Sequence, residues 1–307
     1  MVQENNLKKV IVIVGATASG KTALSVELAK KLNTEIISAD SMLVYKGLDI
    51  GTAKPSLEER QGVKHHLIDV VSPKQTFSVS DYEELATKAL DNIIKNGKIP
   101  IICGGTGFYI NSLLFDLSFG SVAQNPSIRA KYELIAKEKG NEYLHSLLKE
   151  VDPKSAEEIH FNNVKRVIRA LEIFEISGKK KSDFNDGLNK KYDYYAYSID
   201  FPKEELIKRI NLRVDNMFDN GLIDEAKNLI NNGVNLTDQC MQGIGYKELF
   251  PYFNGENTLD EVKETIKLNT RHYAKRQLTF FKRLDGLKYL KPASTSELVD
   301  FIINDIK

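Results

Sequence analysis

A short apolar run followed at once by a glycine-rich turn constrains the fold of this chain more than any other feature. Val10–Val14 is an unbroken run of β-branched residues, which is typical of a buried parallel strand. The turn that follows is Gly15-Ala16-Thr17-Ala18-Ser19-Gly20-Lys21-Thr22, with the glycine and Lys-Thr spacing of a P-loop. Helix-forming residues then continue to Lys31. A strand, this turn and a helix, in this order, predict a loop whose backbone N–H groups surround phosphate oxygens.

The side chains of this loop have their own expected roles. Lys21 supplies a full positive charge, and the hydroxyl of Thr22 can hold a magnesium ion. The motif does not identify the molecule that carries the phosphates, and ATP is the default, in a small-molecule kinase or an NTPase. Such a site would gain support from a second carboxylate after an apolar strand, for which Asp69 is a weak candidate.

Strands and helices alternate along the rest of the first third and resume near the C-terminal half. An amphipathic helix is expected over Tyr82–Ile94, where apolar residues recur at intervals of three and four. Further strands are expected at Glu35–Ser38, Leu67–Val71, Ile99–Cys103 and Tyr194–Ile199, and long helices at 203–232 and 258–285. This alternation predicts an α/β fold with a P-loop NTPase-like parallel sheet.

The pattern changes after about Gly120. From Asn125 to Gly178 the segments are helical and charged, and residues 178–191 are rich in Lys and Asn, as in an exposed loop. We therefore predict a helical insertion domain at 121–192. It interrupts a catalytic core formed by residues 1–120 and 193–307.

Composition excludes several classes of protein. The 307 residues are 42% hydrophobic and carry a net charge of +1, so composition alone gives no hint of a nucleic-acid partner. Cys103 and Cys240 form no disulfide framework or metal-ligand spacing, which indicates a reducing compartment. No segment approaches the roughly 20 apolar residues of a membrane span. We expect a cytoplasmic monomer without a membrane partner.

Two short segments follow predicted strands, at the edge where an open α/β sheet binds its ligand. Asp40 follows the second strand, and Gly104-Gly105-Thr106-Gly107-Phe108-Tyr109 follows the fourth. Glycines let the backbone approach a ligand closely, and Thr106 can form a hydrogen bond there. Each segment also has an ordinary interpretation, because Asp40 could cap a turn and the glycines could form one.

Taken together, the sequence resembles the tRNA dimethylallyltransferase (isopentenyltransferase, IPP transferase) family. The resemblance rests on the P-loop, on the stretch Asp40–Pro55, on Gly104–Tyr109, and on three C-terminal segments, Arg209–Met217, Gln242–Glu248 and Thr270–Phe281. These blocks occur in family order over about residues 10–285. Three departures are Ala16 in place of Pro, Leu43 in place of Gln and Phe280 in place of Trp, and the second puts one hydrogen bond in doubt.

The resemblance implies transfer of a dimethylallyl group from dimethylallyl diphosphate to N6 of adenosine 37 in the anticodon stem-loop of tRNA. Mg²⁺, held by Thr22, is required, and ATP is not consumed. Asp40 is the implied general base, assisted by Thr106 and Lys21. The P-loop residues from Gly15 to Thr22 bind diphosphate together with Arg213 and Arg209. The implied tRNA contacts are Asp40, Ser41, Met42 and Leu43; Lys165, Arg166, Val167, Ile168 and Arg169; and Gln242, Gly243, Ile244, Gly245, Tyr246 and Lys247.

Two basic groups lie hidden in the balanced net charge. Lys263, Lys267, Arg271 and Lys275 recur every four residues, and Lys165, Arg166, Arg169 and Lys179–Lys181 form a second group. Such runs are often solvated helix faces, but two of them near a candidate cleft favour contacts with RNA phosphates. Two other functions remain open. One is a P-loop nucleoside or small-molecule kinase, and the other is a non-catalytic RNA-binding protein with a P-loop fold.

Overall fold

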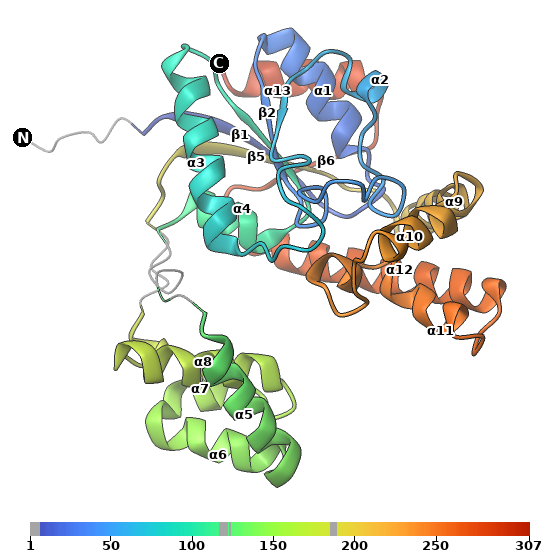
Figure 1. The fold of residues 1–307 in the computed structure, drawn as a ribbon. Helices are drawn as coiled ribbons and strands as arrows, with labels where there is room; N and C mark the ends of the chain where they lie inside the picture. Colours follow the sequence, from blue (N-terminus) through green and yellow to red (C-terminus); the bar gives the residue numbers. More distant parts are fainter. Residues whose placement is uncertain (1–6, 117–121, 123, 185–188) are drawn as a thin grey trace, which may run out of the picture. The chain divides into compact units, whose positions relative to one another are not determined.

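The computed structural model describes residues 7–116, 122, 124–184 and 189–307. The chain divides into two compact units (Figure 1). One comprises Met1–Leu114 and Lys191–Lys307, and is called the core unit here. The other, Phe115–Lys190, is called the insertion unit. The insertion unit thus begins six residues before the predicted position 121 and ends two residues before 192.

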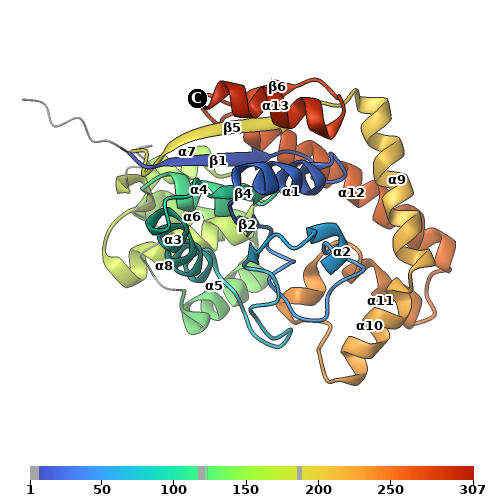
Figure 2. The same cartoon turned by 90° about the horizontal axis from the view of Figure 1, so that it is seen from above.

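The core unit is built on a parallel sheet, as the sequence predicts. Its strands are β1 (Lys9–Val14), β2 (Ile36–Ala39), β3 (His65–His66), β4 (Ile101–Gly104), β5 (Asp193–Ile199) and β6 (Lys288–Leu290). They lie in the order β3-β2-β4-β1-β5-β6, and every pair is parallel. Figure 2 shows β2, β4, β1, β5 and β6 in this order. The predicted α/β class with a parallel sheet is confirmed.

The register of the central strands brings three loops to one place. Gly104 of β4 pairs with Val14 of β1 on one side and with Ala39 of β2 on the other. These three residues each end a strand, so the loops that begin at Gly15, Asp40 and Gly105 leave the sheet at the same level. A ligand site at the carboxyl edge follows from this register.

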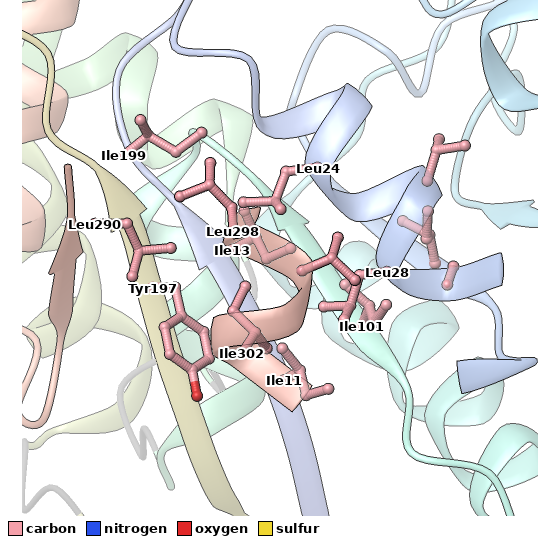
Figure 3. Close-up of a cluster of buried hydrophobic side chains, with 14 of the residues drawn as sticks. Ile11, Ile13, Leu24, Leu28, Ile101, Tyr197, Ile199, Leu290, Leu298 and Ile302 are labelled. Carbon is pink, nitrogen blue, oxygen red and sulfur yellow. The ribbon is translucent and has the colours of Figure 1, made fainter. Parts of the chain in front are cut away.

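Helices cover both faces of the sheet (Figure 1). Helices α1 (Lys21–Leu32) and α13 (Thr295–Asp305) pack on the face that receives Ile11 and Ile13, and this cluster is drawn in Figure 3. Helices α3 (Val79–Lys95) and α4 (Gly107–Leu114) cover the opposite face. Because β1 is buried on both faces, it is apolar at every position from Val10 to Val14.

The C-terminal part of the core unit is helical. It contains α9 (Lys203–Asp219), α10 (Leu222–Asn231), α11 (Phe250–Phe253), α12 (Leu259–Phe281) and the short helices η3 (Gln239–Gln242) and η4 (Lys247–Leu249). The single helix predicted over 203–232 is wrong. Gly221, in the left-handed conformation with φ 95°, separates α9 from α10.

The predicted third strand at Leu67–Val71 is also wrong. Leu67 and Asp69 have φ values of 61° and 58°, which are left-handed and cannot continue a strand. The strand lies two residues earlier, at β3, and Val71 forms only an isolated bridge with Tyr45. A short helix, α2 (Leu57–Arg60), precedes it. Among the described residues no helix is long and apolar enough to cross a membrane.

The insertion unit is a small helical body with its own core. It contains α5 (Pro126–Lys139), α6 (Asn141–Val151), α7 (Pro153–Glu158) and α8 (Val164–Ser177). The predicted loop at 178–191 includes one short helix, η2 (Lys181–Asp183), while residues 185–188 lie outside the described part. Glu172, fully buried on α8, accepts hydrogen bonds from Arg129, Arg169 and the backbone N–H of Asn125. This buried carboxylate ties α5 to α8.

Candidate active site

The P-loop has the geometry of an anion cradle. Gly15 has φ 135°, and a Cβ there would lie 2.6 Å from the Ser198 hydroxyl oxygen, so this position requires glycine. Gly20, with φ 81°, precedes the first turn of α1, whose N–H groups have no helical partner. The hydroxyl of Ser19 is buried without a hydrogen-bond partner in the described structure. A phosphate oxygen would satisfy such a group.

Lys21 occupies the floor of this cradle. Its ammonium donates a hydrogen bond to the carbonyl of Ala16. The pKa of Lys21 is lowered to about 8, chiefly because the side chain is buried; the nearby charge of Arg213 contributes to the lowering, while Cys103 and Asp40 act in the opposite direction. A diphosphate beside Lys21 would favour the protonated form.

Asp40 and Thr106 stand side by side above the ends of β2 and β4. Oδ1 of Asp40 accepts the N–H groups of Met42 at 2.9 Å and Leu43 at 3.4 Å, which is the turn-capping arrangement. Within the described residues its other oxygen, Oδ2, has no hydrogen bond. The Thr106 hydroxyl accepts the N–H of Ser41 at 3.0 Å, and the Thr106 N–H donates to the carbonyl of Ala39 at 3.0 Å. Capping fixes one oxygen of Asp40 and leaves the other for chemistry.

The two glycines between β4 and Thr106 are required by close packing. A Cβ at Gly104 would lie 2.1 Å from the Ala39 carbonyl oxygen, and a Cβ at Gly105 would lie 2.1 Å from Nε2 of Gln277. Gln277, buried on α12, donates to the carbonyl of Gly105 at 3.0 Å and accepts the N–H of Thr17 at 2.8 Å. It therefore joins the P-loop to the Gly105 turn. Gln277 lies in the segment Thr270–Phe281, which carries part of the family resemblance, but no role was predicted for it.

Both predicted diphosphate arginines reach this region from α9. Arg213 donates to the carbonyl of Thr52 at 2.9 Å, and burial lowers its pKa. Arg209 donates to the carbonyl of Ala18 at 2.8 Å and lies over the ring of Phe201, 4.6 Å from its centre. Neither forms an ion pair in the described part of the chain.

Two adjoining cavities share several of these residues. The smaller, about 90 Å³, is lined by P-loop residues including Lys21 and Thr22, and the larger, about 410 Å³, by the segment from Gln239 to Lys247 and by α12. Residues that line both are Thr17, Asp40, Thr52, Arg213 and Tyr273. Burial raises the pKa of Tyr273 to about 12, so its hydroxyl stays protonated near neutral pH. Asp40 thus stands between a phosphate-sized cationic pocket and a wider one.

Several of the predicted tRNA contacts are buried or paired within the protein. Val167 and Ile168 are buried in the core of the insertion unit, and Arg169 is committed to Glu172 and to the carbonyl of Val122. Gly245 and Tyr246 are also buried. Residues that remain available are Ser41, Met42, Leu43, Lys165, Arg166, Gln242, Gly243, Ile244 and Lys247. Asp69, the weak candidate for a second carboxylate, forms an ion pair with Lys54 and lines neither cavity.

The two basic groups differ in how their charges are used. Lys263 and Lys267 on α12 both pair with Asp215 of α9, at 2.9 Å each. Burial alone would raise the pKa of Asp215, but the hydrogen bonds from these lysines bring it below its usual value. Lys165 and Arg166 on α8 are exposed and have no ion pair in the described part of the chain. The α12 stripe is therefore partly neutralised within the protein.

Comparison with known proteins agrees with the arrangement of these blocks. The family model described as IPP transferase matches residues 43–284. This protein belongs to the IPP transferase family. A tRNA dimethylallyltransferase from Acetivibrio thermocellus is 49% identical over 287 residues, which cover 92% of each chain.

Solved structures of IPP transferases are similar over nearly the whole length. A tRNA isopentenylpyrophosphate transferase from Bacillus halodurans is 42% identical with a TM-score of 0.73, covering 97% of this chain and 95% of the other. A eukaryotic dimethylallyltransferase acting on tRNA is 32% identical with a TM-score of 0.83, covering 97% of this chain and 80% of the other. The resemblance seen in the sequence is confirmed.

Proposed function

We propose that this IPP transferase moves a dimethylallyl group from dimethylallyl diphosphate to N6 of adenosine 37 in tRNA, giving N6-(dimethylallyl)adenosine. The observation that carries the proposal is the position of Asp40, which lines both the P-loop cavity and the wider cavity beside it. One carboxylate can therefore face both reacting groups. The curated relatives of this chain have the same named activity.

The smaller cavity would hold the diphosphate. As the bond between the dimethylallyl carbon and the diphosphate oxygen breaks, the electron pair stays on the leaving oxygen. Lys21, Arg213 and the P-loop N–H groups favour that negative charge as it grows. Arg209 would act less directly, because its Nε is bound to Ala18. Thr106 would position a diphosphate oxygen near Asp40.

Magnesium fits this cavity chemically. The Thr22 hydroxyl is a hard oxygen ligand at the start of α1 and lines the same cavity as Lys21. Thr22 would hold the ion together with diphosphate oxygens. When bound, Mg²⁺ neutralises charge on the leaving group.

The wider cavity would receive the adenine. A base inside the anticodon loop can be extruded into a pocket and recognised along its edges. N6 of adenine attacks the carbon, and its proton passes to Asp40, whose Oδ2 is free of protein hydrogen bonds in the described structure. Met42, Gln242, Gly243 and Ile244 line this cavity, and Lys165 and Arg166 would contact phosphates of the anticodon stem. Because its substrate is tRNA, we also propose that the protein works in the cytoplasm. The monomer expected from the sequence stays a prediction.

The kinase alternative loses its main support. A second carboxylate near the phosphates would have supported it, and Asp69 instead binds the buried Lys54. The remaining alternative is a protein that binds tRNA without modifying it.

One experiment separates these functions. Purified protein is incubated with labelled dimethylallyl diphosphate and an anticodon stem-loop bearing adenosine 37, with a guanosine 37 stem-loop as the control. Transfer of label to the first RNA alone supports the proposal. ATP hydrolysis or phosphoryl transfer without label on RNA would support the kinase. RNA binding without either reaction would support a protein that binds tRNA without modifying it.

A further inference from the structure

The turn Asp49–Thr52 carries the atom that orients Arg213. The carbonyl of Thr52 accepts the Arg213 hydrogen bond, and both residues line both cavities. A backbone carbonyl is only as well placed as the turn that contains it. The position of the arginine therefore depends on what holds this turn.

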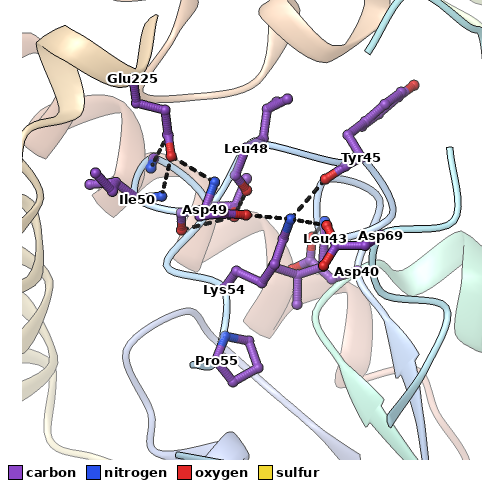
Figure 4. A network of polar contacts seen from close by, with 12 residues as sticks. Asp40, Leu43, Tyr45, Leu48, Asp49, Ile50, Lys54, Pro55, Asp69 and Glu225 are labelled. Atoms are coloured by element: carbon purple, nitrogen blue, oxygen red, sulfur yellow. Dashed lines mark hydrogen bonds and ion pairs between the residues drawn. The ribbon is translucent and has the colours of Figure 1, made fainter. Parts of the chain in front are cut away.

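Glu225, in the first turn of α10, holds the turn directly (Figure 4). Its Oε2 accepts the N–H groups of Asp49 at 2.8 Å and Ile50 at 2.7 Å, and its Oε1 accepts the N–H of Gly51 at 3.0 Å. Oε1 also accepts the hydroxyl of Tyr246. One carboxylate from a distant part of the chain thus binds three successive backbone N–H groups. Charge-assisted bonds of this kind are about twice as strong as neutral ones.

The other side of the turn is equally confined. The ammonium of Lys54, whose side chain is 4% exposed, donates to the Tyr45 carbonyl at 2.8 Å and pairs with Asp49 at 2.6 Å. Gly51 packs against the ring of Tyr246, where an added Cβ would lie 2.5 Å from Cζ. Figure 4 shows Asp49 between Glu225 and Lys54. The turn has little freedom while Glu225 is present.

We propose that Glu225 is a positioning residue for the transfer reaction. It fixes the turn Asp49–Thr52 and, through the Thr52 carbonyl, aims Arg213 at the diphosphate. This inference rests on the proposed function, which assigns the smaller cavity to the diphosphate. Glu225 itself lines neither cavity, so it acts through the residues that it binds, which are the turn and Tyr246 packed against Gly51.

The test compares Glu225→Ala with Glu225→Gln and with Asp224→Ala, an exposed acid beside it on the same helix. Glu225→Ala should raise KM for dimethylallyl diphosphate by about tenfold, because several hydrogen bonds to one charged group are lost together. KM for tRNA and the thermal midpoint should change little. Glu225→Gln keeps one acceptor oxygen and should restore part of the loss. Asp224→Ala should behave as the parent.

A double-mutant cycle with Arg213→Lys tests the route of the effect. If Glu225 acts through Arg213, the two substitutions together should cost no more than Arg213→Lys alone, to within about twofold. Multiplied effects would overturn the proposal. So would a Glu225→Ala variant with unchanged diphosphate KM, or one whose two KM values rise together with a large loss of thermal stability.

A second readout keeps this test separate from the proposed function. Affinity for inorganic diphosphate is measured by calorimetry without any RNA, for the parent and the same variants. Weaker binding by Glu225→Ala and intermediate binding by Glu225→Gln would support the positioning role even if no prenyl transfer were found. Equal affinity in all variants would refute it, whatever the reaction proves to be.

Discussion

The cations of the phosphate cradle and the cations of α12 are held by different kinds of partner. Lys21 and Arg213 donate to backbone carbonyls, those of Ala16 and Thr52. Lys263 and Lys267 bind the carboxylate of Asp215. A carbonyl fixes the direction of a cation without cancelling its charge, whereas a carboxylate does both. Lys21 and Arg213, which are bound by neutral carbonyls, therefore keep their full charge available for a bound anion.

The same comparison separates α12 from α8. Both basic groups look alike in the sequence, because each gathers several Lys and Arg residues within a short segment. On α12 the facing helix supplies an acid, while Lys165 and Arg166 on α8 stay exposed and unpaired in the described structure. The phosphate cradle, α8 and α12 thus differ in how much of their positive charge stays available, and the predictions below test these differences.

The largest effect is expected at Asp40, the carboxylate beside the phosphate cradle. Asp40 is the only acid among the described residues that line the two cavities. Asp40→Asn should lower the rate of prenyl transfer by about 10²–10⁴, because the proton acceptor is lost. Affinity for dimethylallyl diphosphate should be nearly unchanged. Single-turnover rates and equilibrium binding would check this, and near-normal turnover would leave Asp40 only its capping role.

Removing a cradle cation should have the next largest effect. Lys21→Ala should weaken dimethylallyl diphosphate binding by about 10–100-fold, since it removes a hydrogen bond between charged groups. Affinity for tRNA should stay within about twofold of the parent. Binding isotherms for each substrate would measure both. A variant with parental diphosphate affinity would show that the P-loop N–H groups and Arg213 suffice.

Titration of the same lysine gives a pH-dependent test. The pKa of Lys21 is about 8 in the free protein, so the side chain is charged below that value. Because diphosphate favours the charged form, affinity should be constant below pH 8. It should then fall above pH 8, by up to about tenfold per pH unit. Calorimetry between pH 7 and 9.5 would reveal the slope, and Lys21→Ala is the matched control that should lack it.

The smallest effect concerns the two basic helices. Replacing Lys165 and Arg166 together by Ala should flatten the dependence of log tRNA affinity on log salt by about one unit per lost contact. Replacing Lys263 and Lys267 together should change this slope much less, because Asp215 already neutralises them. Affinity over a series of salt concentrations compares the pairs. The opposite ranking would show that tRNA displaces Asp215.

Local patterns in the sequence were sufficient for four strands of the sheet, β1, β2, β4 and β5, and for the cradle, whereas β3 was misplaced and β6 was not predicted. The run Val10–Val14 and the P-loop after it predict a strand, a turn and a helix because each depends only on neighbouring residues. Asp40 and Thr106 could be placed together for a related reason. They follow adjacent parallel strands, so their positions follow from topology.

Features that depend on distant partners were missed or misplaced. Leu67–Val71 has the apolar pattern of a strand, but its left-handed residues bend it toward Tyr45 and Lys54. Arg169 looks like a surface cation, yet the buried Glu172 requires it. Nothing local predicts that Asp215 faces α12. Contacts of this kind are set by packing between elements, which periodicity along one helix does not describe.

The junction between the units indicates which part of the chain could change in length without disturbing the sheet. Lys191 N–H donates to the Leu114 carbonyl at 2.8 Å, and beyond this bond Phe115 and Lys190 form an antiparallel bridge. The backbone therefore leaves the core unit and returns to it at neighbouring points, like the two ends of the loop in a β-hairpin. A short hairpin turn could close the same gap without altering any strand of the sheet. The 115–190 segment could thus change in length while the order and register of the core strands stay the same.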